Sequence, residues 1–73
     1  MEQEFIEIIE ALNGATMLPG SFDKMFTKHL NRMRTEGKSL TDVSRRHTLR
    51  LMHKYRDQIP TIFNKHLELW KSL

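Results

Sequence analysis

Apolar residues recur three and four positions apart through most of this chain, and this spacing limits the fold to packed helices. The repeat runs through four segments, from about Glu2 to Leu12, Ser21 to Gly37, Thr41 to Ile59 and Pro60 to Ser72. Because a helix turns by about 100° per residue, this spacing gathers apolar side chains on one face. No segment alternates apolar and polar residues as a half-buried strand would. We therefore predict an all-α fold, a compact bundle of three to four short helices forming a single domain over residues 1–73.

Local signals predict where these helices begin and end. Ser21 and Thr41 stand where N-caps are expected, because a hydroxyl there can accept a hydrogen bond from a backbone N–H of the first turn. Gly37 is a typical residue after a helix end. Pro60 lacks the N–H that a continuing helix needs, so it should stop or sharply bend the third helix. The segment 14–21 is predicted to be the one real loop.

The apolar faces predict the core. Its residues come from all four segments: Phe5, Ile8, Ile9 and Leu12; Phe22, Met25, Phe26, His29, Leu30 and Met33; Leu40, His47, Thr48, Leu51, Met52, Tyr55 and Ile59; and Ile62, Phe63, His66, Leu67 and Trp70. Met17 and Leu18, in the loop, are expected to plug the same core.

The stretch from Leu40 to Pro60 carries the densest positive charge. Projected on a helix over 41–59, its basic residues fall on the side away from the apolar face, and Leu49 projects from among them. Such a composition is typical of a surface that meets a partner. The predicted binding residues are Arg45, Arg46, Leu49, Arg50, His53, Lys54 and Arg56.

The charge is unevenly distributed along the chain. Residues 1–23 hold five acids and no Lys or Arg, whereas residues 24–56 hold ten Lys or Arg and two acids. The asymmetry admits two interpretations: the basic part is an anion-binding surface, or the acidic first helix folds back onto a basic one. Both remain open at the level of the sequence.

Composition argues against several classes of protein. The chain has no cysteine, so neither a disulfide nor a thiolate is available. No apolar run approaches the length of about 20 residues that a membrane helix needs, so no membrane partner is expected. The acidic N-terminal stretch is unlike a secretory leader, and we expect a cytoplasmic location.

No arrangement of residues predicts catalysis. The four histidines, His29, His47, His53 and His66, form no recognised metal-ligand spacing, and no nucleophile or phosphate-loop motif occurs. We therefore expect no enzyme activity, no metal and no cofactor. His29 and His66 lie on apolar faces and are expected to be half-buried packing residues, whereas His53 is expected to be solvated.

Two functions remain from different classes. The basic face of the helix over 41–59 could bind nucleic acid, with DNA favoured over RNA, and the second and third helices could form a helix-turn-helix. Alternatively, Leu49 among the arginines could anchor a protein partner. A homodimer would also bury more apolar surface than so small a chain can bury alone.

Three stretches carry a family resemblance. PGSFDKMF at Pro19–Phe26, LT at Leu40–Thr41 and YRDQIP at Tyr55–Pro60 resemble a pattern, FDKxF…LT…KYRxQIP, in small uncharacterised phage and prophage helical proteins. The resemblance covers Pro19–Pro60. It implies a phage accessory protein in the cytoplasm of a bacterial host. Such a protein would associate with nucleic acid or inhibit a host enzyme or defence complex.

Overall fold

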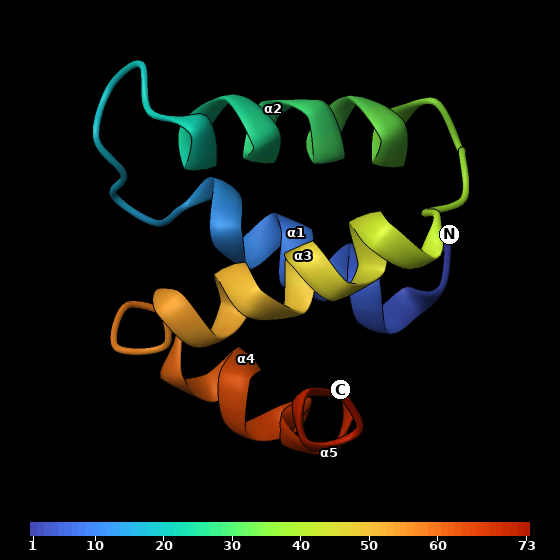
Figure 1. Ribbon diagram of the computed structural model, residues 1–73, viewed down its shortest axis with the longest axis vertical. Helices are drawn as coiled ribbons and strands as arrows, with labels where there is room; N and C mark the ends of the chain where they lie inside the picture. The colour runs from blue at the N-terminus through green and yellow to red at the C-terminus, as the bar shows by residue number, and fades with distance from the viewer.

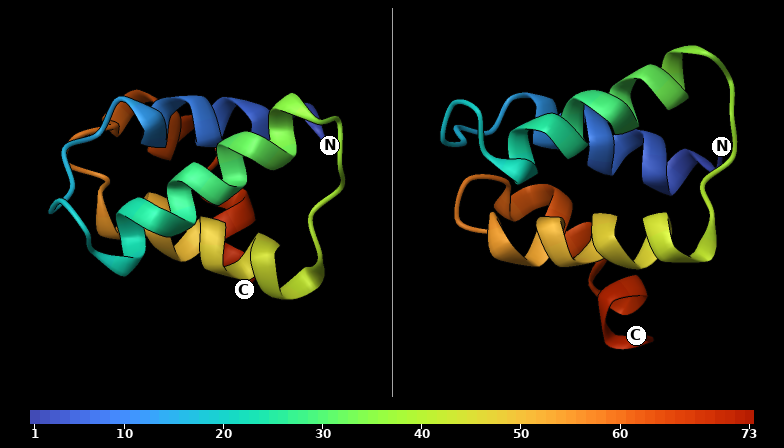
Figure 2. Two further views of the ribbon diagram at one scale, coloured as in Figure 1. Left: turned by 90° about the horizontal axis from the view of Figure 1, so that it is seen from above. Right: turned by 45° about the horizontal axis from the view of Figure 1, so that its top comes forward.

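A computed structural model describes residues 1–73 and contains five helices and no strand (Figure 1). They are α1 (Gln3–Asn13), α2 (Phe22–Thr35), α3 (Asp42–Lys54), α4 (Pro60–Lys65) and α5 (Leu67–Lys71). Helices α1 and α3 occupy the middle, with α2 on one side of them and α4 and α5 on the other (Figures 1 and 2). The predicted all-α bundle is confirmed. None of its helices combines the length and apolarity of a membrane span.

Helix α1 supplies the centre of the core. The predicted stripe of Phe5, Ile8, Ile9 and Leu12 is buried along its whole length. Helix α1 packs against α2, α3 and α4, while α5 packs against α3. The stripe meets buried side chains from the later helices, among them Leu30, Leu51, Met52 and Ile59.

The predicted caps are confirmed. The Ser21 hydroxyl accepts a hydrogen bond from the backbone N–H of Lys24 at 3.2 Å, and the Thr41 hydroxyl accepts one from Ser44 at the same distance. Each bond satisfies a donor that the first turn of a helix leaves unpaired. Gly37 follows the end of α2 with φ +71°, a conformation that a side chain would strain.

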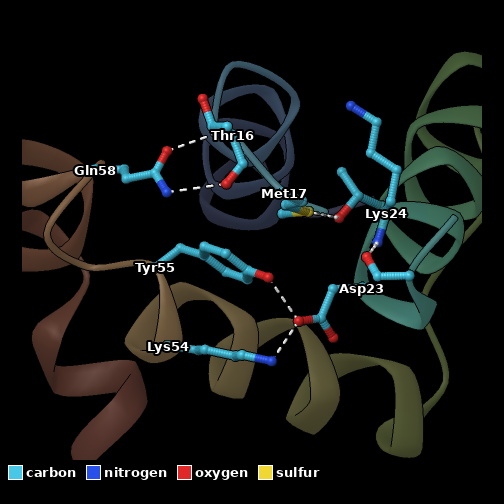
Figure 3. Close-up of polar contacts among 9 residues, drawn as sticks. Thr16, Met17, Asp23, Lys24, Lys54, Tyr55 and Gln58 are labelled. Carbon is cyan, nitrogen blue, oxygen red and sulfur yellow. Dashed lines mark hydrogen bonds and ion pairs between the residues drawn. The ribbon is translucent and has the colours of Figure 1, made fainter. Parts of the chain in front are cut away.

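Helix α3 ends at Lys54, five residues before the predicted end at Ile59. The chain leaves the helix through tight turns, in which the N–H of Gln58 bonds to the carbonyl of Tyr55 at 2.9 Å. The side chain of Gln58 then accepts a hydrogen bond from the N–H of Thr16 and donates one to its carbonyl, at 2.6 and 3.0 Å (Figure 3). This paired contact holds the turn against the loop between α1 and α2.

The fourth predicted helix is broken at His66, which has φ −110° and ψ 22°. Its buried ring forms a 2.8 Å hydrogen bond with Glu7 of α1, as expected for a packed histidine with one partner. Beyond the break, α5 turns across α3, and Trp70 stacks on His53 with ring centroids 4.3 Å apart. Two contacts between distant parts of the chain therefore accompany the break.

Helix α2 does not bury the face that its sequence predicts. Leu30 is fully buried, but Phe22 and Met25 are 64% and 63% exposed, and His29 is also exposed. The buried side of the helix is instead centred near Leu30 and Thr27. Of the predicted apolar row, Phe22, Met25 and His29 are therefore turned towards the surface, whereas Phe26 and Met33 are half-buried.

The rotation of α2 follows from a polar contact at its start. The Asp23 carboxylate accepts hydrogen bonds from the Lys54 ammonium at 2.6 Å and the Tyr55 hydroxyl at 2.7 Å (Figure 3). These bonds turn Asp23 towards α3 and leave its neighbour Phe22 outside. Similarly, Met17 in the preceding loop is buried, but Leu18 is 78% exposed, so only one of the two predicted plugs enters the core.

Helices α2 and α3 each pack mainly on α1 rather than on each other. They run in roughly opposite directions in Figure 1 but cross obliquely when seen from above (Figure 2, left). The connection, residues 36–41, is also longer than the turn of about three to four residues in a helix-turn-helix. A helix-turn-helix with this longer connection therefore stays a prediction.

Candidate functional site

The acidic first helix folds back onto basic residues, which was one of the two interpretations of the charge asymmetry. Three of its acids form ion pairs with later parts of the chain: Glu2 with Arg45, Glu7 with Lys65 at 2.9 Å, and Glu10 with Arg34 at 3.6 Å. Of these three cations, only Arg45 belongs to the predicted binding residues.

Leu49 is buried, not exposed, and the prediction that it anchors a partner is wrong. Only 5% of its surface is accessible. Helix α5 crosses α3 beside it, and Leu49 lines a cavity of about 480 Å³ together with Phe5, Leu69 and Leu73. The helical projection places Leu49 among the basic residues, and the sequence did not reveal that a further helix would cover this side of α3.

Two of the predicted cations already have acidic partners. The Arg45 guanidinium pairs with Glu2 and lies 4.7 Å from the centroid of the Phe5 ring. The Lys54 ammonium is bound to Asp23. These carboxylates raise the pKa of both cations, Arg45 chiefly through Glu2 and Lys54 through Asp23. Both side chains therefore connect helices to one another.

Two further predicted residues also make contacts within the fold. His53 was expected to be solvated but is half-buried, because its ring stacks on Trp70. Arg56 is exposed, and its guanidinium donates a 2.9 Å hydrogen bond to the carbonyl of His53 at the end of α3. Of the seven predicted residues, Arg46 and Arg50 are the two that are exposed without such a contact.

A different surface emerges on the outer sides of α2 and α3. On α2, the exposed Phe22 stacks on Phe26 with centroids 5.8 Å apart. On α3, the His47 ring contacts both phenylalanines edge-on, at 5.4 and 4.4 Å. Val43, one turn before His47, is 69% exposed. The two helices therefore share one apolar surface across their boundary.

Unpaired cations flank this apolar surface. Lys28 and Arg32 are exposed on α2, and Arg46 and Arg50 are exposed on α3. None of the four forms an ion pair within the molecule. Each pair is four residues apart, so its members lie on the same side of a helix about 6 Å apart. By helical projection, the α2 pair lies on the side of the apolar row away from α3, and the α3 pair lies beyond Val43.

We call this surface the α2–α3 face. It comprises Phe22, Met25, Phe26, Lys28, His29 and Arg32 of α2 with Val43, Arg46, His47 and Arg50 of α3. Among the nearby acids, Asp23 is bound to Lys54 and Tyr55, whose hydrogen bonds lower its pKa, and Glu36 pairs with Lys38, whereas Asp42 at the start of α3 is exposed and has no ion pair. The face is therefore apolar in the middle and positive at both edges.

His47 has an unusual environment within this face. Its Nε2 atom is buried and has no hydrogen-bond partner. The adjacent rings of Phe22 and Phe26 offer no strong acceptor in the plane of the imidazole. An unpaired buried polar atom costs free energy. This part of the α2–α3 face therefore holds a polar atom whose hydrogen-bonding capacity is unused in the free protein.

A second polar cluster lies on the other side of the molecule and is structural. Glu7 of α1 binds both Lys65 of α4 and His66, and these hydrogen bonds, that of Lys65 first, lower its pKa to about 2. None of the three residues lines a cavity. The cluster joins α1 to α4 and the start of α5. No group of three or more metal-ligating side chains occurs in the chain.

Fold and surface together define a small all-α bundle with an exposed apolar face edged by cations. Comparison of the chain with protein-family models, with curated proteins and with solved structures gives no match. The resemblance to phage and prophage proteins therefore stays a prediction from the sequence.

Proposed function

We propose that this chain is a non-catalytic binding protein and that its α2–α3 face binds another protein. The observation that carries the proposal is the exposure of Phe22, Met25 and Val43 on two adjacent helices. A folded chain of this size gains stability from burying such side chains, and grouped exposed apolar residues commonly mark interaction surfaces. An inhibitor of a host enzyme or defence complex, which the family resemblance implies, is one protein of this kind.

The residue types support the same proposal. Phenylalanine, methionine and arginine are enriched in protein interfaces, and the centre of an interface is depleted of charge. The α2–α3 face has this layout, with Phe22 and Met25 near its middle and Arg32 and Arg46 at its edges. Residues at the centre would supply most of the affinity, and those at the edges would favour an oppositely charged partner.

The test is capture from a nuclease-treated lysate of the source cell with immobilised protein. Wild type should retain a specific protein that Met25→Asp loses, because a charge at the centre of the face opposes burial. Thr61→Asp is the matched control, since Thr61 is exposed on α4, away from this face. Equal capture by all three proteins would contradict the proposal.

Nucleic acid is a second candidate, supported by the four unpaired cations of the same face. If phosphate contacts dominate, a labelled single-stranded or duplex DNA should bind, with an affinity that falls steeply as salt rises. Arg46→Glu with Arg50→Glu should then abolish binding, whereas Met25→Ala should change it little. Fluorescence anisotropy measures both. Absence of DNA binding at low salt would exclude this candidate.

A further inference from the structure

We infer that the partner element recognised by the α2–α3 face is an acidic amphipathic α-helix. This inference rests on the proposed function and specifies the chemistry of the partner. It follows from the shape of the apolar row and from the cations that flank it.

The apolar row has the length and spacing of a helix-docking surface. Phe22, Met25 and His29 lie at positions i, i+3 and i+7 of α2, which span about 10 Å along the helix axis. An amphipathic helix presents anchors at the same intervals over about two turns. Val43 and His47 form the second wall, so an incoming helix would pack against both α2 and α3.

The cations set the charge of that helix. A helix that lies on the apolar row has Lys28 and Arg32 of α2 along one side, and where it reaches α3 it approaches Arg46 and Arg50 beyond Val43. Carboxylates on both flanks of its apolar stripe would pair with them, and a basic helix would meet like charge on both sides. The partner should therefore carry Asp or Glu on either side of its apolar positions.

A second copy of this chain fits the surface poorly. Two α2–α3 faces placed together would bring four cations against four cations, which costs free energy. A contact with another part of the same chain would need exposed acids. Glu2, Glu7 and Glu10 already form ion pairs, which leaves Glu4 as the one unpaired acid of the acidic segment before α2.

Nucleic acid fits the middle of the surface poorly. Phe22 is exposed but Phe26 is half-buried, whereas single-strand binding uses several stacking rings along a groove. Met25 and Val43 would contribute neither stacking nor phosphate contacts. A protein helix, in contrast, would bury all three side chains.

The experiment is selection of peptides of about 18 residues, displayed in a randomised helical library, against the intact protein. We expect recovered sequences to carry apolar residues at i, i+3, i+4 and i+7 with Asp or Glu on both flanks. A synthetic peptide of this type should bind at least about tenfold more weakly to Phe22→Ala. It should associate about tenfold more slowly with Arg46→Glu/Arg50→Glu, with the difference shrinking at high salt. Thr61→Ala is the control.

Each alternative outcome overturns a distinct part of the account. Recovered helices that are neutral or basic would refute the acidic partner while leaving a protein-binding face. Peptides without helical spacing, or whose binding ignores Phe22→Ala, would refute helix docking on this face. If no peptide is enriched and single-stranded DNA of about 20 nucleotides binds in a Phe22-dependent manner, both the inference and the proposed protein-binding function fail. Thermal unfolding checks that each variant remains folded.

Discussion

At the scale of single residues, burial decides which side chains can meet a partner, and helical projection alone predicts burial for some residues and not for others. Phe5 and Thr48 lie centrally on their helices and are buried as predicted. Leu49 projects among the basic residues of α3, where its burial depends on whether another element covers it. Helix α5 covers Leu49, and the sequence of α3 alone does not predict where α5 packs.

Replacing Leu49 with Asp should therefore destabilise the fold, not merely remove a contact on the surface. Burying an unpaired carboxyl beside Phe5 and Leu69 should cost roughly 3 kcal/mol or more of the free energy of unfolding. Val43→Asp, at an exposed position on the same helix, should change stability by about 0.5 kcal/mol or less. Urea denaturation measures both, and equal stability of the two variants would contradict the burial of Leu49.

Glu7 should make stability depend on pH in acid. Its folded-state pKa, about 2, lies below the ordinary value of 4.5 because Lys65 and His66 hold the charged form. The unfolded chain therefore takes up a proton at higher pH, so the stabilisation is complete above about pH 4.5 and is lost as the pH falls towards 2. Glu7→Gln should lose this part of the acid dependence, whereas Glu68→Gln should retain it. Denaturation between pH 5 and 2 provides the measurement.

At the scale of elements, caps are readable from sequence because their chemistry is local. Ser21→Ala and Thr41→Ala should each lower the free energy of unfolding by about 1 kcal/mol, since each leaves a backbone N–H of the first turn unpaired. Ser39→Ala, in the connecting segment before α3, is the control and should be nearly neutral. Thermal unfolding compares the three, and a neutral Thr41→Ala would contradict the capping geometry.

The sequence of α2 alone does not predict which of its faces is buried, because this depends on residues more than thirty positions away. Asp23 is held by Lys54 and Tyr55, and the turn that places Tyr55 is held in turn by Gln58 on Thr16 (Figure 3). The break at His66 has the same origin in a distant partner, Glu7. Periodicity predicted both helices but not these tertiary contacts.

Asp23→Asn tests this account of the rotation. The amide cannot pair with the Lys54 ammonium and weakens the bond from Tyr55, so the free energy of unfolding should fall by about 1–3 kcal/mol. Asp57→Asn, an exposed change in the turn after α3, should have little effect. An unchanged stability for Asp23→Asn would show that packing on α1 alone orients α2.

At the scale of the whole molecule, a small bundle cannot bury every apolar face that its sequence contains. Helix α1 is surrounded by α2, α3 and α4, so its stripe fills the core and leaves the outer row of α2 at the surface. The sequence therefore predicted the fold class and the basic helix, including the exposed Arg46 and Arg50. It assigned Phe22 and Met25 to the core, because amphipathic spacing does not distinguish a buried face from a binding face.

The most direct test of the α2–α3 face is chemical-shift mapping of the nitrogen-15-labelled protein. The probe is an acidic amphipathic peptide of about 18 residues, with leucines at helical spacing and glutamates on both flanks. We predict shifts concentrated at the amides of Phe22, Met25, Val43, Arg46 and Arg50, with α4 and the Glu7 cluster unchanged. Shifts centred on α4 and α5, or none at millimolar peptide, would contradict the account.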